Sequence, residues 1–265
     1  MSNKSGPKIL LLDIETSPII AHVWGLWDQT VSLNQIKMDW HVLSWSAKWL
    51  HSREVMYQDQ RKAKNIEDDK ELLKGIWNLL DEADIIITQN GRAFDQKRLN
   101  ARFILNGMKP PSSYKHIDTK QIASRHFGFT SNKLEYLTSK LCTKHKKLKS
   151  KKFQGFELWK ACMAGNVDAW EEMKRYNIRD VLSLEELYKK LAPWDNSINF
   201  AVYYDKEIDI CSCGSKSFNK NGYAYTSLGK FQRYACASCG AESRSATNEF
   251  SKEKRASLKR KADKK

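Results

Sequence analysis

The stretch KILLLDIET, residues 8–16, is an apolar run that ends abruptly in acids. Such a run predicts a buried strand. Asp13 and Glu15 stand two positions apart, so a strand presents both carboxylates on one face while Ile14 points into the core. Two carboxylates held together favour a shared cation, and hard oxygen ligands suit Mg²⁺ or Mn²⁺. For this motif alone, an ordinary exposed strand end is the alternative.

Strands and helices follow one another along the next 180 or so residues. Strand-like alternation covers 41–59, a helix capped by Asn65 is predicted over 65–84, a short strand covers 85–88, and a helix covers 96–105. Residues 119–127 and 132–142 have helical patterns. The longest helix is predicted from Asn166 or Asp168 to Leu191, with Pro193 ending it. This order predicts an α/β layered fold.

Two further motifs place acids after these elements. Asp95 follows the second buried strand, a turn that begins at Asn90 and the aromatic Phe94, and it would open a helix. Helix capping is the alternative for this acid. Tyr176 and Asp180 are four positions apart on the longest helix and therefore share a face. A charge at the edge of that helix is the alternative for Asp180.

In this order and spacing, the three motifs resemble the DnaQ-like 3′→5′ exonucleases of the ribonuclease H-like superfamily, the DEDD group. The D-x-E motif matches residues 13–15, the second motif matches residues 90–95, and Y-x-x-x-D matches residues 176–180. The histidine subgroup needs His at position 175, which is Arg175 here, so the match is to the tyrosine subgroup. VLSWSAKWL and YNIRDV are most similar to the proofreading branch of the family B polymerases. The resemblance covers about residues 8–192 and implies a mixed sheet flanked by helices.

The resemblance implies a metal-dependent exonuclease that acts on single-stranded DNA and releases nucleoside 5′-monophosphates. Two Mg²⁺ or Mn²⁺ ions would be held by Asp13, Glu15, Asp95 and Asp180, with Asp13 between both ions. Tyr176 would orient the attacking water, because its unperturbed pKa of about 10 makes it a poor base. Asp118 resembles an acid found between the second and third motifs, and no role is assigned to it. An RNA exonuclease with the same site and a non-catalytic nucleic-acid or replisome adaptor are the alternatives.

Positive charge is concentrated in two short segments. The chain has 265 residues and a formal net charge of +15; residues 140–152 hold seven lysines and no acid, and residues 251–265 hold eight basic residues and two acids. Concentrated lysine is typical of polyanion binding, with a solvated loop and a solubilising tail as the alternative. The predicted nucleic-acid contacts are Asn90, Phe94, Lys144, Lys146, Lys147, Lys149, Lys151, Lys152, Arg233 and Tyr234.

Four cysteines near the C-terminus form two close pairs. Cys211-x-Cys213-Gly and Cys236-x-x-Cys239-Gly are separated by 22 residues. This spacing predicts a zinc ribbon with one structural Zn²⁺ held by all four thiolates, and disulfides are the alternative. The segment is similar to ribbons of transposase and phage nucleic-acid proteins. It would contact DNA or dock a replication or repair protein, and both interpretations stay open.

A change of composition marks a domain boundary, because all nine tryptophans lie at or before Trp194. We predict an exonuclease domain over 1–193, a linker over 194–208, a zinc ribbon over 209–250 and a basic disordered tail over 251–265. No apolar run approaches about 18 residues, so a membrane span is excluded, and the N-terminal apolar stretch is too short for a signal peptide. We expect an intracellular, cytoplasmic protein; its organisation would suit a virus-encoded one.

Five tryptophans follow the first motif: Trp24, Trp27, Trp40, Trp45 and Trp49. Trp45 and Trp49 share their parity in the predicted strand with an apolar neighbour, which favours core packing. Trp24 and Trp27 lie in the loop-like stretch WGLW. For these two, stacking on single-stranded bases and core packing both remain open.

Overall fold

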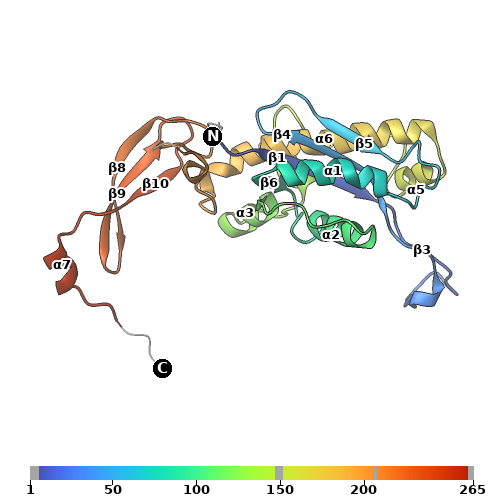
Figure 1. The fold of residues 1–265 in the computed structure, drawn as a ribbon, viewed down its shortest axis with the longest axis horizontal. Coiled ribbons are helices and arrows are strands. Elements are labelled where there is room, and N and C mark those ends of the chain that lie inside the picture. Colours follow the sequence, from blue (N-terminus) through green and yellow to red (C-terminus); the bar gives the residue numbers. More distant parts are fainter. Residues whose placement is uncertain (1–5, 147–151, 206–207, 262–265) are drawn as a thin grey trace. The chain divides into compact units, whose positions relative to one another are not determined.

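The computed structural model describes residues 6–146, 152–205 and 208–261 (Figure 1). By its internal contacts the chain divides into two compact units. One unit covers Pro7–Lys190, and the other covers Leu191–Lys265 together with the N-terminal residues up to Gly6. The finer domain limits expected at 193, 208 and 250 stay predictions.

A five-stranded mixed sheet forms the centre of the Pro7–Lys190 unit. Its strands lie in the order β5 (Met56–Asp59), β4 (Val42–Trp49), β1 (Ile9–Thr16), β6 (Ile85–Thr88) and β7 (Lys115–Asp118). β4 is antiparallel to both β1 and β5, whereas β6 is parallel to β1 and β7. The predicted mixed α/β fold is therefore confirmed.

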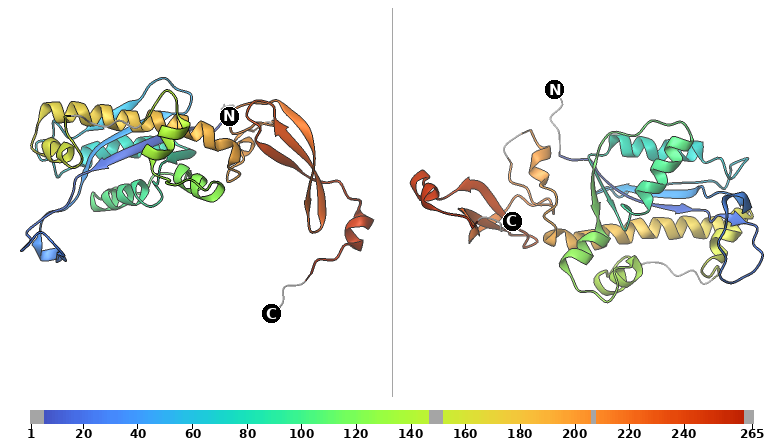
Figure 2. Two further views of the ribbon diagram at one scale, coloured as in Figure 1. Left: turned by 180° about the vertical axis from the view of Figure 1, so that it is seen from behind. Right: turned by 90° about the horizontal axis from the view of Figure 1, so that it is seen from below.

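Helices cover both faces of this sheet, as its edge-on view shows (Figure 2). α1 (Lys70–Glu82) and α2 (Asp95–Leu105) pack on one face, against Leu10, Leu12 and Ile14 of β1. α6 (Val167–Leu191) runs along the other face, with α5 (Glu157–Met163) beside its N-terminal part. α3 (Thr119–His126) and α4 (Leu134–Leu141) complete the unit. The alternation of β1 therefore leaves residues 13 and 15 facing α6.

The start of α1 differs from the sequence-based expectation. The helix begins at Lys70 rather than Asn65, and Asn65 accepts a hydrogen bond from the backbone N–H of Glu67 within a turn. Asp69 immediately precedes the helix but does not cap it. Its fully buried carboxylate instead accepts hydrogen bonds from the Val42 backbone N–H and from the Arg102 guanidinium. The carboxylate of Asp69 is therefore engaged in a tertiary contact and does not cap α1.

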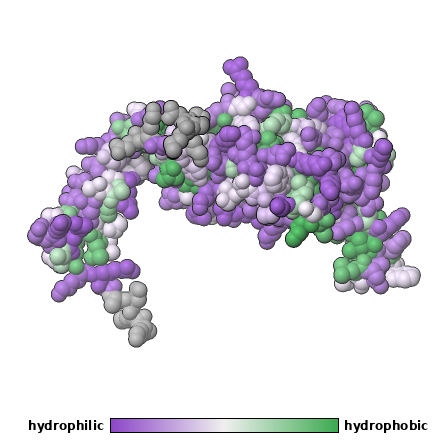
Figure 3. Space-filling view, viewed as in Figure 1, coloured by the Kyte–Doolittle hydropathy of each residue, from purple (hydrophilic) through white to green (hydrophobic). Residues whose placement is uncertain are grey.

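Between β1 and β4 the chain forms a separate two-stranded segment, β2 (Ile20–Ala21) and β3 (Ile36–Met38), with a 3₁₀ turn at Leu33–Gln35. Trp24 and Trp27 are 98% and 83% exposed, which excludes core packing for both. Apolar side chains are visible on this segment in the space-filling view (Figure 3). Trp45, by contrast, is buried and donates its indole N–H to the Leu72 carbonyl, and Trp49 packs against the same core. The core interpretation of these last two residues is confirmed.

The second unit contains two 3₁₀ turns, Ala192–Trp194 and Phe200–Tyr203, followed by an antiparallel sheet. The sheet has the order β10 (Glu242–Asn248), β9 (Gly229–Cys236), β8 (Phe218–Thr226). The tail after residue 250 was expected to be disordered, but it contains a short exposed helix, α7 (Lys252–Ser257). The Ser251 hydroxyl caps the first turn of this helix. Over residues 6–146, 152–205 and 208–261, the helices are too short or too polar to cross a membrane.

Candidate active site

Three acids from two elements converge at the end of β1. Asp13 and Glu15 come from β1 and Asp180 from α6, and one carboxylate oxygen of each lies within 4.8 Å of the others. Asp180 is only 3% exposed, whereas the two β1 acids are half-buried. Like charges this close raise one another's free energy unless a cation or a proton intervenes. The donor set, carboxylate oxygens alone, fits a hard divalent cation such as Mg²⁺ or Mn²⁺.

Asn177, the residue after Tyr176, fixes the position of Asp13 against α6. Its fully buried side-chain amide donates to the Asp13 carboxylate at 2.6 Å and to the Asp13 carbonyl at 3.2 Å. Ser44 and Ser46 lie opposite Glu15 and Asp13 in the β1–β4 register, and their hydroxyls donate to the side-chain and backbone oxygens of Asn177. One residue thus ties β1, β4 and α6 together beneath the acids. The sequence motifs miss it because it carries no charge.

Asp95 lies beside the same strand but outside the three-acid cluster. Its Oδ1 accepts a hydrogen bond of 3.2 Å from the backbone N–H of Ile14, between Asp13 and Glu15. The β1–β6 pairing ends at Leu11↔Ile87, so β6 does not supply a partner at Ile14. The buried carboxylate takes that place. Asp95, the first residue of α2, therefore lies next to the first motif.

The turn before Asp95 is organised by Asp118 at the end of β7. Its carboxylate accepts hydrogen bonds from the backbone N–H groups of Asn90 (2.8 Å) and Arg92 (3.2 Å), and it also caps α3. Asn90 has a φ of 68°, in the left-handed region, and Gly91 is packed so closely that a Cβ would lie 2.2 Å from Thr88 Oγ1. Asp118 therefore holds the turn of the second motif by backbone hydrogen bonds and is not one of the clustered acids.

Burial raises the pKa of Asp95 to about 7, and the nearby Asp118 charge acts in the same direction, while hydrogen bonds from backbone N–H groups oppose the shift. Below about pH 7, the neutral form of Asp95 is therefore favoured in the folded, metal-free protein. Between the unfolded value of about 3.9 and about 7, the folded state keeps a proton that the unfolded chain releases. Stability should consequently fall as pH rises through this window.

Replacing Asp95 with Asn should stabilise the metal-free protein at pH 8, because the amide cannot ionise. Each pKa unit corresponds to about 1.4 kcal/mol, so the gain in free energy of unfolding is at most about 4 kcal/mol. At pH 3, below both pKa values, the variant and the wild type should melt alike. Chemical or thermal unfolding in EDTA at both pH values measures this.

The matched control is Asp168→Asn, an exposed carboxyl whose pKa is lowered by its hydrogen bond and ion pair with Lys152. That pairing is present above the unfolded pKa, so its loss should not stabilise the protein at pH 8. Equal melting of Asp95→Asn and wild type at pH 8 would show that burial of the Asp95 charge is not costly.

Tyr176 and Glu15 share a neighbour that the sequence motifs did not identify, Trp159 of α5. The indole N–H of Trp159 donates to Glu15 Oε2 at 3.1 Å. The Trp159 and Tyr176 rings meet edge to face, with centroids 5.9 Å apart and an interplanar angle of 79°. α5 has no motif signal, so only the tertiary structure reveals this contact.

Phe94, predicted to contact nucleic acid, lies on the surface next to Asp95. It is 36% exposed. The Arg98 guanidinium lies 5.3 Å from the Phe94 ring centroid and 4.1 Å from that of Trp40. The spacing of four between Phe94 and Arg98 on a helix could have indicated part of this stack, whereas Trp40 joins it from a distant segment. Asn90, the other predicted contact here, accepts a hydrogen bond from Lys120 Nζ at 3.0 Å.

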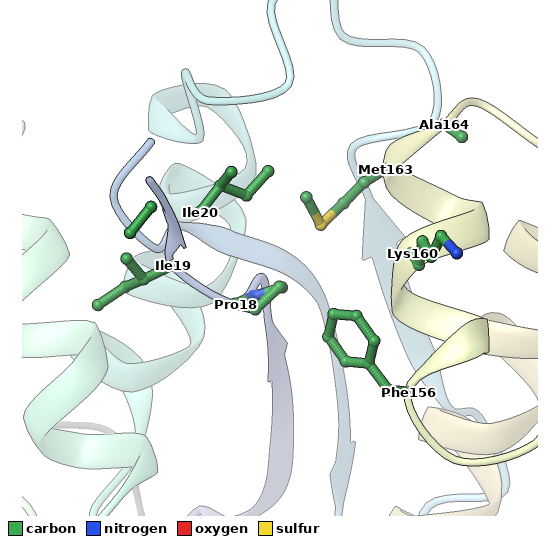
Figure 4. A pocket seen from close by; sticks show the side chains of 8 residues that line it. Pro18, Ile19, Ile20, Phe156, Lys160, Met163 and Ala164 are labelled. Atoms are coloured by element: carbon green, nitrogen blue, oxygen red, sulfur yellow. The ribbon is translucent and has the colours of Figure 1, made fainter. Parts of the chain in front are cut away.

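A cavity of about 530 Å³ lies between α5 and the residues that follow the first motif (Figure 4). Its walls are mostly apolar, with Ile19, Ile20, Phe156 and Met163 among them and Lys160 as the one charged side chain. Both walls are close in sequence to residues of the site: one begins three residues after Glu15, and the other includes α5, which carries Trp159.

The lysine-rich segment is described only in part. Lys147, Lys149 and Lys151 lie outside the described residues. Lys144 and Lys146 are exposed, and their loop is anchored by Glu186 of α6, which accepts hydrogen bonds from the backbone N–H groups of residues 143–145. Lys152 forms an ion pair with Asp168 at 2.5 Å.

The four paired cysteines form a second cluster, in the other unit. Their sulfur atoms all lie within 4.8 Å of one another, with Cys211–Cys239 at 3.5 Å and Cys213–Cys236 at 3.7 Å. A disulfide would need about 2.05 Å, and all six cysteines are free thiols. Four sulfurs at 2.3 Å around a tetrahedral Zn²⁺ stand about 3.8 Å apart. The cluster therefore fits a zinc ribbon, and the short C-x-C pair reaches the site as well as the C-x-x-C pair does.

The ribbon's predicted contact residues have different surroundings. Arg233 donates to the Asn221 carbonyl at 2.8 Å and lies 3.7 Å from a Glu242 oxygen, so contacts within the ribbon hold its guanidinium. Tyr234 is half-buried on β9. Lys230 lies 3.7 Å from the Tyr223 ring centroid.

The chain belongs to the RNase H superfamily, whose family model matches residues 41–192. The matched range includes Asp95, Tyr176 and Asp180 and begins after Asp13 and Glu15. Among solved structures, the chain is similar to the family B DNA polymerase from the hyperthermophilic archaeon Pyrobaculum calidifontis, with a TM-score of 0.53 and 16% sequence identity. The similarity covers 71% of this chain and 25% of the polymerase chain, so this chain spans only a quarter of the polymerase. A comparison with curated proteins finds no match.

The superfamily and the acid cluster together support a function of the nuclease type, with nucleic acid as the binding partner. The acid cluster and the cysteine cluster can each hold metal ions.

Proposed function

We propose that this protein is a metal-dependent 3′→5′ exonuclease that hydrolyses single-stranded DNA and releases nucleoside 5′-monophosphates. The convergence of Asp13, Glu15 and Asp180 within 4.8 Å carries the proposal. The order and spacing of the three motifs support the 3′→5′ direction, because they match the tyrosine subgroup of the DEDD exonucleases.

The acids would hold two Mg²⁺ or Mn²⁺ ions, which when bound supply an activated water and neutralise charge on the phosphate. Asp13 would serve both ions, Glu15 and Asp180 would hold the one on the nucleophile side, and Asp95 would serve the other through water. Asn177 keeps Asp13 in place by its 2.6 Å hydrogen bond. Tyr176 would orient the attacking water, with its ring packed edge to face with that of Trp159.

Two surfaces formed by residues near the motifs suit a single strand. The cavity beside α5 offers apolar walls to a base and Lys160 to a phosphate. The Phe94–Arg98–Trp40 stack adds an exposed aromatic ring and a cation on the side of the second motif. Base–aromatic stacking is worth about 1–3 kcal/mol per base and does not depend on sequence. Exposed Lys144 and Lys146 would add phosphate contacts.

One structural Zn²⁺ would hold the ribbon together. The ribbon and the basic segment after it would strengthen binding to DNA. On the ribbon, Tyr223 and Tyr225 are 40% and 67% exposed, and Lys230 lies beside them on β9. Docking of a replication or repair protein is the competing outcome for this surface.

The test is a gel of 5′-labelled single-stranded DNA and RNA of one sequence, incubated with Mg²⁺, Mn²⁺ or EDTA. The proposal expects a ladder of DNA that shortens from the 3′ end and is absent in EDTA. A ladder on RNA alone would change the substrate. Immediate release of labelled mononucleotide would reverse the direction. A band shift without cleavage would favour a non-catalytic adaptor.

A further inference from the structure

Trp159 sits on a helix that is firmly anchored. Leu158 and Cys162 of α5 are buried at a spacing of four and pack with Leu43, Trp170 and Met173. Trp159 adjoins this buried stripe and is itself half-buried. The indole therefore projects from a fixed backbone, which limits the directions in which it can point.

The indole contacts two predicted site residues from different elements. Its N–H donates to Glu15 of β1 at 3.1 Å, and its ring packs edge to face with that of Tyr176 of α6. Edge-to-face pairs are favourable beyond the area that they bury. A glutamate has three side-chain torsions, so without such a contact its carboxylate can rotate away from a metal.

A neutral donor suits this place better than a charged one. An ionised carboxylate has about four lone-pair positions, and the indole N–H occupies one of them. A lysine or arginine would neutralise Glu15 and repel the incoming metal. The indole N–H orients the carboxylate and leaves its charge in place.

From these contacts we infer that Trp159 is a positioning residue that holds Glu15 for metal binding and Tyr176 for the attacking water. Only the part that concerns Tyr176 and the attacking water rests on the proposed function. It concerns a residue that lies outside all three motifs, and simple packing of α5 is the competing explanation for its burial.

The test compares Trp159→Phe with wild type in Mn²⁺ binding, measured by electron paramagnetic resonance of free Mn²⁺. Phenylalanine keeps an aromatic ring and removes the N–H. Loss of such an outer contact typically weakens metal affinity about 10- to 100-fold, and a loss of about tenfold is expected. Trp77→Phe is the matched control: it removes an indole N–H that donates to the Lys109 carbonyl, and Trp77 lies on α1, outside the three-acid cluster.

Fold and function are separated by two further measurements. Melting of each variant in EDTA reports whether the fold is intact. If the protein hydrolyses DNA, Trp159→Phe should recover activity as the Mn²⁺ concentration is raised. Trp159→Ala, which also removes the ring contact with Tyr176, should keep a lowered kcat at saturating Mn²⁺ with little change in KM for DNA.

Equal Mn²⁺ affinity of wild type and Trp159→Phe would overturn the inference, and so would an equal loss in Trp77→Phe. If wild type binds Mn²⁺ and loses affinity in Trp159→Phe but hydrolyses no nucleic acid, the proposed function fails while the positioning of Glu15 stands. If wild type hydrolyses DNA and Trp159→Phe binds Mn²⁺ as tightly as wild type, the proposed function stands while the positioning role fails.

Discussion

Asp13→Asn is expected to lower the rate of DNA hydrolysis about a thousandfold or more. Asp13 is the acid shared by both proposed metal positions, and metal ions contribute several kcal/mol of transition-state stabilisation, with each 1.36 kcal/mol worth a factor of ten. The amide can keep the hydrogen bond from Asn177, because its oxygen can replace Oδ2. Single-turnover digestion of 5′-labelled DNA measures the rate.

Two comparisons separate chemistry from folding. The melting temperature of Asp13→Asn in EDTA should equal or exceed that of wild type, because one of three crowded charges is removed, while the rise caused by Mn²⁺ should be lost. Glu71→Gln is the matched control: it removes an exposed charge on α1 that pairs with Lys74 at 2.5 Å and lies outside the cluster. Near-normal hydrolysis by Asp13→Asn would refute the assignment of the site.

Cys236→Ser is expected to unfold the ribbon, the largest effect on stability that we foresee. Structural Zn²⁺ contributes on the order of 10–16 kcal/mol to the folding of small zinc domains, and the ribbon sheet has few large buried side chains. Although burial acts to raise it, hydrogen bonds from the backbone N–H groups of Cys239 and Ser238 lower the pKa of Cys236 to about 6. This thiol is therefore readily available as a thiolate ligand.

Zinc content by elemental analysis and limited proteolysis after residue 208 report the outcome. Ser238→Ala, in the same turn, keeps the backbone N–H and all four sulfurs and should retain one Zn²⁺ per chain. The Pro7–Lys190 unit should keep its helical circular dichroism in both variants. A zinc-free ribbon that resists proteolysis would show that its sheet is stable without metal.

The main elements of the fold were predictable because their patterns are local. The apolar run of β1, the stripe of α6 and the short strand β6 each show their periodicity within a few residues. The start of α1 was not predictable, since Asp69 is drawn into a buried contact with Arg102 from α2. Exposure of Trp24 and Trp27 likewise depends on β2 and β3 forming a segment apart from the main sheet.

The residues of the candidate site likewise divide into those that local motifs reveal and those that only the tertiary structure reveals. The acids and Tyr176 were identified because each motif keeps its residues within a few positions. Asn177 and Trp159 were not, because each acts through contacts with β1 at separations of 164 and 144 residues. Asp118 was noticed without a role, and its two hydrogen bonds to the second-motif turn supply one. The roles of the predicted lysines, Arg233 and Tyr234 stay predictions.

The distribution of the acid cluster along the chain has a consequence for the protein during its synthesis. Asp13 and Glu15 are made early, whereas Asp180 and the amide of Asn177 that steadies Asp13 arrive only with α6, the last helix of their unit. A nascent chain on the ribosome therefore cannot assemble the three-acid cluster before residue 180 has emerged. The proposed metal site is therefore completed only when nearly all of the Pro7–Lys190 unit has been synthesised.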